Sequence, residues 1–299
     1  MRLVFVLVTT LALHGIAGAA CPPAGGTRSQ LLELRTAKWE VADNARRQSL
    51  ALGMLDCLAD PDPVLRDEIA FEALSTWLRA GKLDAVTVDA IRTRELAVLA
   101  NSDGDSAGFA QPFAALVLAE VARIDRIKPI LGDPQRAELV RAGTRYLSSV
   151  RDYRGFDEKQ GWRHGVAHAS DLMMQLALNP ALGKTAQQQI LAAVAAQLSA
   201  AGAQSPAVFF HYGEGERLMR PVFYLARRGE LDAPDWAAWC AGLVPPAAER
   251  AAITQASLAR RHNLQGFLMP LYVSLNESKD VAQRERLLPA VKKALEQLD

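Results

Sequence analysis

The part of the sequence that decides the fold is Gly161-Trp162-Arg163-His164-Gly165-Val166-Ala167-His168-Ala169-Ser170-Asp171-Leu172, near the middle of the chain. Its apolar residues continue at helical spacing through Met173, Leu176 and Ala177. Amphipathic segments with the same period flank it on both sides. The stretch therefore predicts a helix over residues 161–178 inside a helical protein.

The composition indicates the same fold class. Half of the 299 residues are hydrophobic, only 6% are aromatic, and the strong helix formers Ala and Leu are abundant. The segment with the most strand-like alternation, residues 207–210, is too short to found a sheet. We predict an all-α protein with helices, separated by Gly, Pro and Asn breaks, over about 28–40, 44–58, 63–80, 84–100, 106–124, 134–151, 161–178, 184–200, 215–229, 232–241, 247–275 (broken once) and 279–298.

One helix start resembles those of HEAT-type repeats, in which pairs of helices stack on one another. Asp62 is expected to cap this helix, and Pro63 suits its first turn. The breaks at Pro61, Pro134 and Pro180 are unevenly spaced. We therefore expect an irregular α-solenoid, a HEAT-like stack of antiparallel helix pairs.

The N-terminal residues read as a secretory signal. Arg2 supplies the positive start, Leu3–Leu13 the apolar core, and Ala17–Ala20 the small residues of a cleavage site. The apolar run is roughly half as long as a membrane-spanning helix. We predict a signal peptide over 1–20, a single helical domain over 21–299, and a periplasmic or secreted protein without a transmembrane span.

The three cysteines are Cys21, Cys57 and Cys240, and an odd number leaves one unpaired. Cys21 directly follows the expected cleavage site, so a lipid anchor there is one interpretation. Gly18 stands where a lipobox usually has Leu, which favours ordinary cleavage. If Cys21 were lipidated, Cys57 and Cys240 would be the pair in an oxidising compartment.

The charge of the chain argues against a nucleic-acid partner. Lys and Arg number 34 and Asp and Glu 33, which gives a net charge of +1. Binding to phosphate backbones requires a basic stripe, and the sequence has none.

On a helix over 161–178, the residues His164, His168, Asp171 and Gln175 share one narrow stripe. Two histidines and a carboxylate could bind a divalent metal, or Asp171 could orient His168 as a general base. A polar, partly buried helix face with no chemistry fits the same pattern. The HExxH pattern of metalloproteases is absent, and we assign no metal ligands.

Other polar residues could complete a site around this stripe. Arg154 and Asp157 lie in the predicted loop before the helix, and Trp162 is the second residue of the central stretch. Glu216 opens a later helix, although Arg220, one turn on, makes an ion pair the simpler expectation for it.

The central stretch resembles domain of unknown function family 2785, an uncharacterised bacterial family. The residues that fit its pattern are Arg154, Gly155, Gly161, Trp162, His164, Ala167, His168 and Asp171. Residues 62–67 and 109–118 are also similar, although Ala110-Gln111-Pro112 departs from the family. The resemblance covers residues 45–235 and implies an all-helical, HEAT-like domain, with no activity assigned.

Two functions fit these observations. The first is a binding module with a groove around the central helix, for a peptide, protein or small-molecule ligand. The alternative is a hydrolase that uses His168 and Asp171 with Glu158 or Glu216, with or without a metal. No nucleophile elbow, P-loop or dinucleotide fingerprint is present, so the sequence names neither a reaction nor a cofactor.

Overall fold

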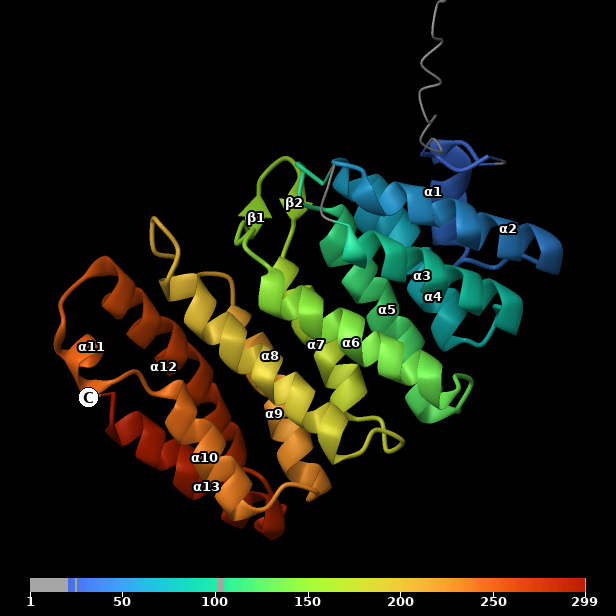
Figure 1. Ribbon diagram of the computed structural model, residues 1–299. Coiled ribbons are helices and arrows are strands. Elements are labelled where there is room, and N and C mark those ends of the chain that lie inside the picture. The colour runs from blue at the N-terminus through green and yellow to red at the C-terminus, as the bar shows by residue number, and fades with distance from the viewer. Residues whose placement is uncertain (1–20, 25, 102–104, 299) are drawn as a thin grey trace, which may run out of the picture.

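The computed structural model describes residues 21–24, 26–101 and 105–298, so the predicted signal peptide lies outside the described residues. Helices joined by short loops make up the described chain, with one pair of two-residue strands (Figure 1), and the predicted all-α class is confirmed. The elements are α1 (Arg28–Thr36), α2 (Asn44–Met54), η1 (Leu55–Ala59), η2 (Val64–Phe71), α3 (Glu72–Arg79), α4 (Ala85–Ala100), α5 (Ala110–Ile127), α6 (Asp133–Ser149), β1 (Phe156–Asp157), β2 (Gly161–Trp162), α7 (Gly165–Ala177), α8 (Lys184–Gly202), α9 (Glu214–Arg228), α10 (Ala233–Leu243), α11 (Ala247–Ala251), α12 (Gln255–Asn276) and α13 (Val281–Glu296).

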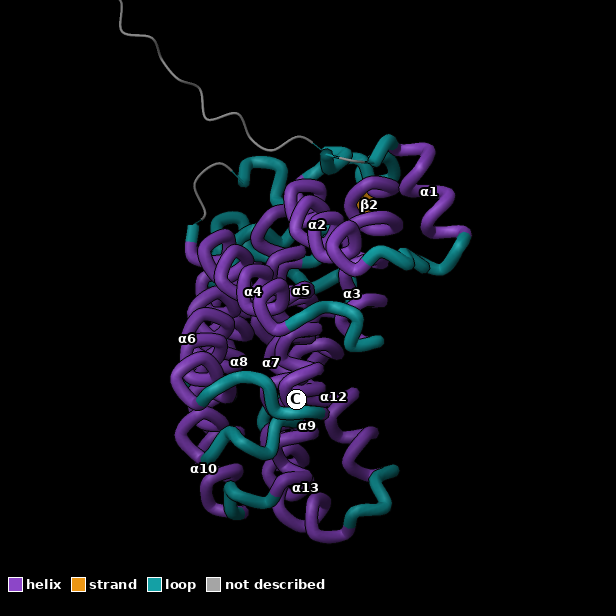
Figure 2. Tube along the Cα trace, turned by 90° about the vertical axis from the view of Figure 1, so that its right-hand side faces the viewer, coloured by secondary structure: helices purple, strands orange, loops and turns teal. Residues whose placement is uncertain are grey.

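The helices form two layers. α4, α6, α8 and α10 lie side by side in one layer, and α3, α5, α7, α9 and α12 lie in the other (Figures 1 and 2). α4 packs on α5 and α6 on α7 across the layers, so successive helices alternate between them. This arrangement buries one continuous apolar core.

α7 lies at the centre of the second layer, between α5 and α9. Ten of its 13 residues are buried, which is typical of a helix covered on several sides. Gly143 of α6 allows a close crossing, because a Cβ there would lie 2.5 Å from Met173 and 2.9 Å from Leu172. The central stretch of the sequence is therefore also central in the fold.

The predicted start of the central helix is wrong. Residues 161 and 162 form β2, which pairs antiparallel with β1 in a short hairpin, and α7 begins only at Gly165. His164 has a left-handed backbone, with φ 55° and ψ 40°, which non-glycine residues seldom adopt and which separates the hairpin from the helix. His164 thus precedes the helix and does not lie on its face.

Most other predicted helices differ from the structure only at their ends. The single break predicted within 247–275 lies between α11 and α12. Asp62 caps its helix start by accepting a hydrogen bond from the Val64 amide at 2.9 Å. The helix predicted over 63–80 is divided into η2, which has π-helical hydrogen bonding, and α3.

Cys21 forms a disulfide with Cys57, which attaches the N-terminal segment to η1. The conditional pairing of Cys57 with Cys240 is therefore not made, and Cys240 is a buried free thiol. A sulfur in a disulfide cannot also carry a thioether-linked lipid. None of the helices in the described ranges is long and apolar enough to cross a bilayer.

Glu95, on α4, gives a test of this packing. It is 2% exposed, and burial raises the pKa of its carboxyl to about 8, so the folded protein holds a proton that the unfolded chain releases near pH 4.5. Stability should therefore fall as pH rises from about 4.5 to 8. We compare the free energies of unfolding in urea of Glu95→Gln and wild type at pH 5 and at pH 8. The difference between the two proteins should shift in favour of Glu95→Gln by at least about 1 kcal/mol from pH 5 to pH 8.

The matched control is Glu285→Gln, because Glu285 is an exposed carboxylate on α13. An equal effect of pH on both variants would contradict the assignment of a buried proton to Glu95.

Candidate functional site

Three aromatic side chains form an exposed surface beside the start of α7. Phe156, Trp162 and Tyr212 are 48%, 40% and 39% exposed, and no other described Phe, Trp or Tyr is classed as exposed. The ring centroids are 4.9 Å apart for Phe156 and Trp162 and 5.7 Å apart for Trp162 and Tyr212. We call these three residues the aromatic face.

The aromatic face joins two segments that are distant in the sequence. Phe156 and Trp162 come from the β-hairpin, whereas Tyr212 lies in the loop before α9. Gly155 makes the contact between them, because any Cβ at that position would lie only 2.0 Å from the Tyr212 ring. Tyr212 is therefore held against the hairpin by a glycine that has no room for a side chain.

His164 and His168 lie beneath this surface. The His164 ring is tilted by 32° against Trp162, with centroids 4.0 Å apart, and lies 6.0 Å from the ring of His168. His168 in turn contacts Phe113 of α5, edge to face. The prediction that the two histidines are neighbours is confirmed, although a turn and a helix, and not one helix face, bring them together.

Burial keeps both imidazoles neutral. Burial is the largest cause that lowers the pKa of His168 to about 3, and the neighbouring His164 and Arg217 contribute to the same shift. The pKa of His164 is also lowered, mainly by burial, while a hydrogen bond to the Tyr212 backbone opposes the shift. His164 Nε2 and His168 Nδ1 are buried, and neither has a hydrogen-bond partner among the described residues.

Asp171 does not orient His168, and that hypothesis is wrong. Both carboxylate oxygens of Asp171 accept hydrogen bonds from Arg217 Nη1, at 2.6 and 2.5 Å. Gln175, the last residue of the predicted stripe, accepts one from Arg126 at 2.7 Å. The stripe is thus divided between neutral histidines and a separate ion pair.

The remaining candidates have structural contacts outside the aromatic face. Arg154 pairs with Asp152, and Asp157 accepts hydrogen bonds from the amides of its own hairpin turn. Glu216 pairs with Arg220 at 2.8 Å, which confirms the simpler expectation for it.

The individual site residues named from the sequence did not include Phe156, Tyr212 or Arg217, although the charged and aromatic segments that hold them were recognisable as possible parts of a site. Phe156 and Tyr212 are aromatic residues in loop sequences that are rich in charged residues and glycine. This composition is the sequence feature that indicates a possible binding role for both. Nothing in the sequence pairs Arg217 with Asp171, because the two lie 46 residues apart. Within the described ranges, no cluster of three or more His, Cys, Asp or Glu side chains is placed to hold a metal ion.

The described chain is an all-α protein whose central helix α7 begins beneath the aromatic face. The model of a family described as protein of unknown function, DUF2785, matches residues 96–273. The chain belongs to this family, as the resemblance indicated, although the match begins later and ends further along than we expected. Comparisons with curated proteins and with solved structures gave no match.

The neutral state of His168 predicts acid sensitivity. With the folded pKa at about 3, the unfolded chain binds a proton near pH 6.5 that the folded protein does not, so stability should fall as pH decreases below about 6.5. Between pH 6 and pH 5, the free energy of unfolding in urea should fall by about 1 kcal/mol less in His168→Gln than in wild type.

His211→Gln is the control, because His211 is exposed. The buried neutral state would be disproved by a His168→Gln protein whose stability falls with acid as steeply as that of wild type.

Proposed function

We propose that this protein is a binding module that holds its ligand against the aromatic face. The observation that carries the proposal is the exposure of Phe156, Trp162 and Tyr212 in mutual contact, while the other described aromatic residues are buried or partly buried. Exposed apolar side chains gathered at one place mark binding surfaces, and aromatic rings contribute large contact area at low entropic cost.

The packing around Gly155 and His164 supports a preformed surface. Tyr212 cannot move toward the hairpin without meeting Gly155, and Trp162 is supported from below by the His164 ring. A rigid platform loses little entropy on binding, which favours affinity. We infer a ligand with a flat apolar ring, either an aromatic group or the apolar face of a sugar.

The contacts of His168 favour binding over acid–base catalysis. A general base works best with a pKa near the working pH, whereas the pKa of His168 is about 3. Asp171 is bound to Arg217, and Glu216 is bound to Arg220. His168 therefore lacks the carboxylate partner that the hydrolase hypothesis requires.

We further propose that the protein acts after export, as a single helical domain over residues 21–299 in the periplasm or outside the cell. The Cys21–Cys57 disulfide supports an oxidising compartment. The alternation of helices between two layers supports a HEAT-like stack. The extended surface of such a stack would present the aromatic face to a partner.

The aromatic face can be tested with small ring compounds by saturation-transfer NMR. Indole and methyl glucoside are used as separate probes. We expect at least one of them to receive magnetisation from the wild-type protein. Trp162→Ala and Tyr212→Ala should each reduce this transfer by about fivefold or more, because stacking on one ring contributes about 1 kcal/mol.

Ile253→Ala is the control, since Ile253 is an apolar side chain that is 88% exposed elsewhere on the molecule. Transfer that is absent in the wild type, or that falls equally in the Ile253→Ala protein, would refute the proposed role of the aromatic face.

A further inference from the structure

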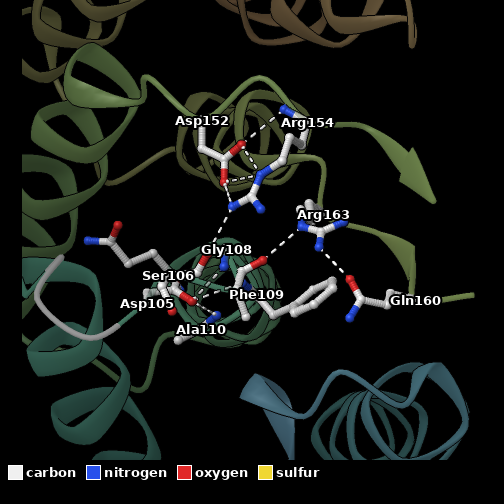
Figure 3. A network of polar contacts seen from close by, with 11 residues as sticks. Asp105, Ser106, Gly108, Phe109, Ala110, Asp152, Arg154, Gln160 and Arg163 are labelled. Carbon is white, nitrogen blue, oxygen red and sulfur yellow. Dashed lines mark hydrogen bonds and ion pairs between the residues drawn. The ribbon is translucent and has the colours of Figure 1, made fainter.

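A cavity lies at the start of α7, and none of the residues of the aromatic face lines it. Its volume is about 380 Å³, within the size range of small-molecule sites. Arg145, Arg151, Arg163, Tyr146 and Gly165 are among the lining residues. We call it the arginine pocket, and Figure 3 shows the polar network around Arg163 at its edge.

The three arginines of this pocket have no carboxylate partner among the described residues. Arg163 is only 8% exposed, and it donates to the Ala107 carbonyl at 2.7 Å and to Gln160 Oε1 at 2.6 Å, both neutral acceptors (Figure 3). Arg151 donates to the backbone carbonyls of Ser148 and Val150. Arg163 therefore has no ion-pair contact, although its charge acts on the nearby carboxylates of Asp152 and Asp157 and lowers their pKa values.

The two carboxylates in the pocket wall are already occupied. Asp105 accepts hydrogen bonds from four consecutive backbone amides at the start of α5, those of residues 108–111 (Figure 3). Asp152 is bound by the Arg154 guanidinium. The charge of Asp105 is thus offset by the backbone amides at a helix start, and that of Asp152 by Arg154. The three arginines of the pocket then give it a positive charge.

Tyr146 gives a second, independent indication of a ligand. The residue is 5% exposed, and its hydroxyl lies 3.4 Å from the place where a Cβ on Gly165 would be, at the wall of the pocket. It makes no hydrogen bond to a described residue. The hydroxyl is not among the fully buried polar atoms without a partner, so it is accessible from the pocket and its proton is free to be donated to a ligand there.

The first turn of α7 adds backbone donors. No side chain caps this helix, so the amides of its first turn are not satisfied by a capping group, and the N-terminal end of a 13-residue helix favours negative charge. We propose that the arginine pocket binds a small molecule through a carboxylate or phosphate group. Arg145 and Arg163 supply charge, while the Tyr146 hydroxyl and the start of α7 donate hydrogen bonds.

The test is isothermal titration calorimetry of the full chain with inorganic phosphate and, separately, succinate, at low ionic strength. We expect at least one probe to bind at a single site, and the probe that binds more tightly identifies the group. Arg145→Glu should weaken binding by roughly tenfold or more, since a charge-assisted contact is replaced by repulsion. Tyr146→Phe should weaken it by roughly threefold.

The matched control is Arg141→Glu, which makes the same charge change on an exposed position one turn earlier in α6, outside the pocket. Arg145 makes no hydrogen bond or ion pair with a described residue, so its replacement leaves the fold intact, which circular dichroism checks. Absence of binding for both probes, or equal losses in Arg141→Glu and Arg145→Glu, would overturn the proposal. Neither result bears on the aromatic face, which has different residues.

Discussion

The left-handed backbone of His164 is the constraint on which the arrangement of this protein's central region depends. A non-glycine residue in that conformation costs about 1 kcal/mol or more and needs compensation from its surroundings. Here the His164 ring packs against Trp162, with ring centroids 4.0 Å apart. The turn stops the hairpin at Trp162 and starts α7 at Gly165, so that Trp162 stays at the surface while His168 enters the core beside Phe113.

The short segment from residue 162 to residue 165 serves two surfaces at once. Trp162 and His164 belong to the aromatic face and its support, whereas Arg163 and Gly165 line the arginine pocket. The end of β2 and the left-handed turn at His164 direct neighbouring residues to these two different surfaces. One irregular segment between a hairpin and a helix thereby brings both proposed sites to the same end of α7.

The helical fold could be predicted because its signals are local. Apolar periodicity, Asp62 at a helix start and breaks at Gly and Pro depend on neighbouring residues only. The site could be predicted only in part. The helical pattern extends back through His164 and Trp162, and the left-handed turn that interrupts it leaves no local signature. The pattern therefore predicts a helical turn where the structure has a strand and a turn. The partners of Asp171 and Gly155 lie 46 and 57 residues further along the chain, and tertiary packing alone brings them into contact.

The polar residues of the central stretch form separate units, namely two neutral histidines and an Asp171–Arg217 ion pair, and do not form a catalytic dyad. The most direct measurement is a pair of double-mutant cycles for unfolding free energy, which combine Asp171→Asn with Arg217→Gln and with His168→Gln. The ion pair predicts a coupling of about 1–2 kcal/mol between Asp171 and Arg217, and a coupling within about 0.5 kcal/mol between Asp171 and His168. A coupling of Asp171 to His168 as large as that to Arg217 would contradict the account.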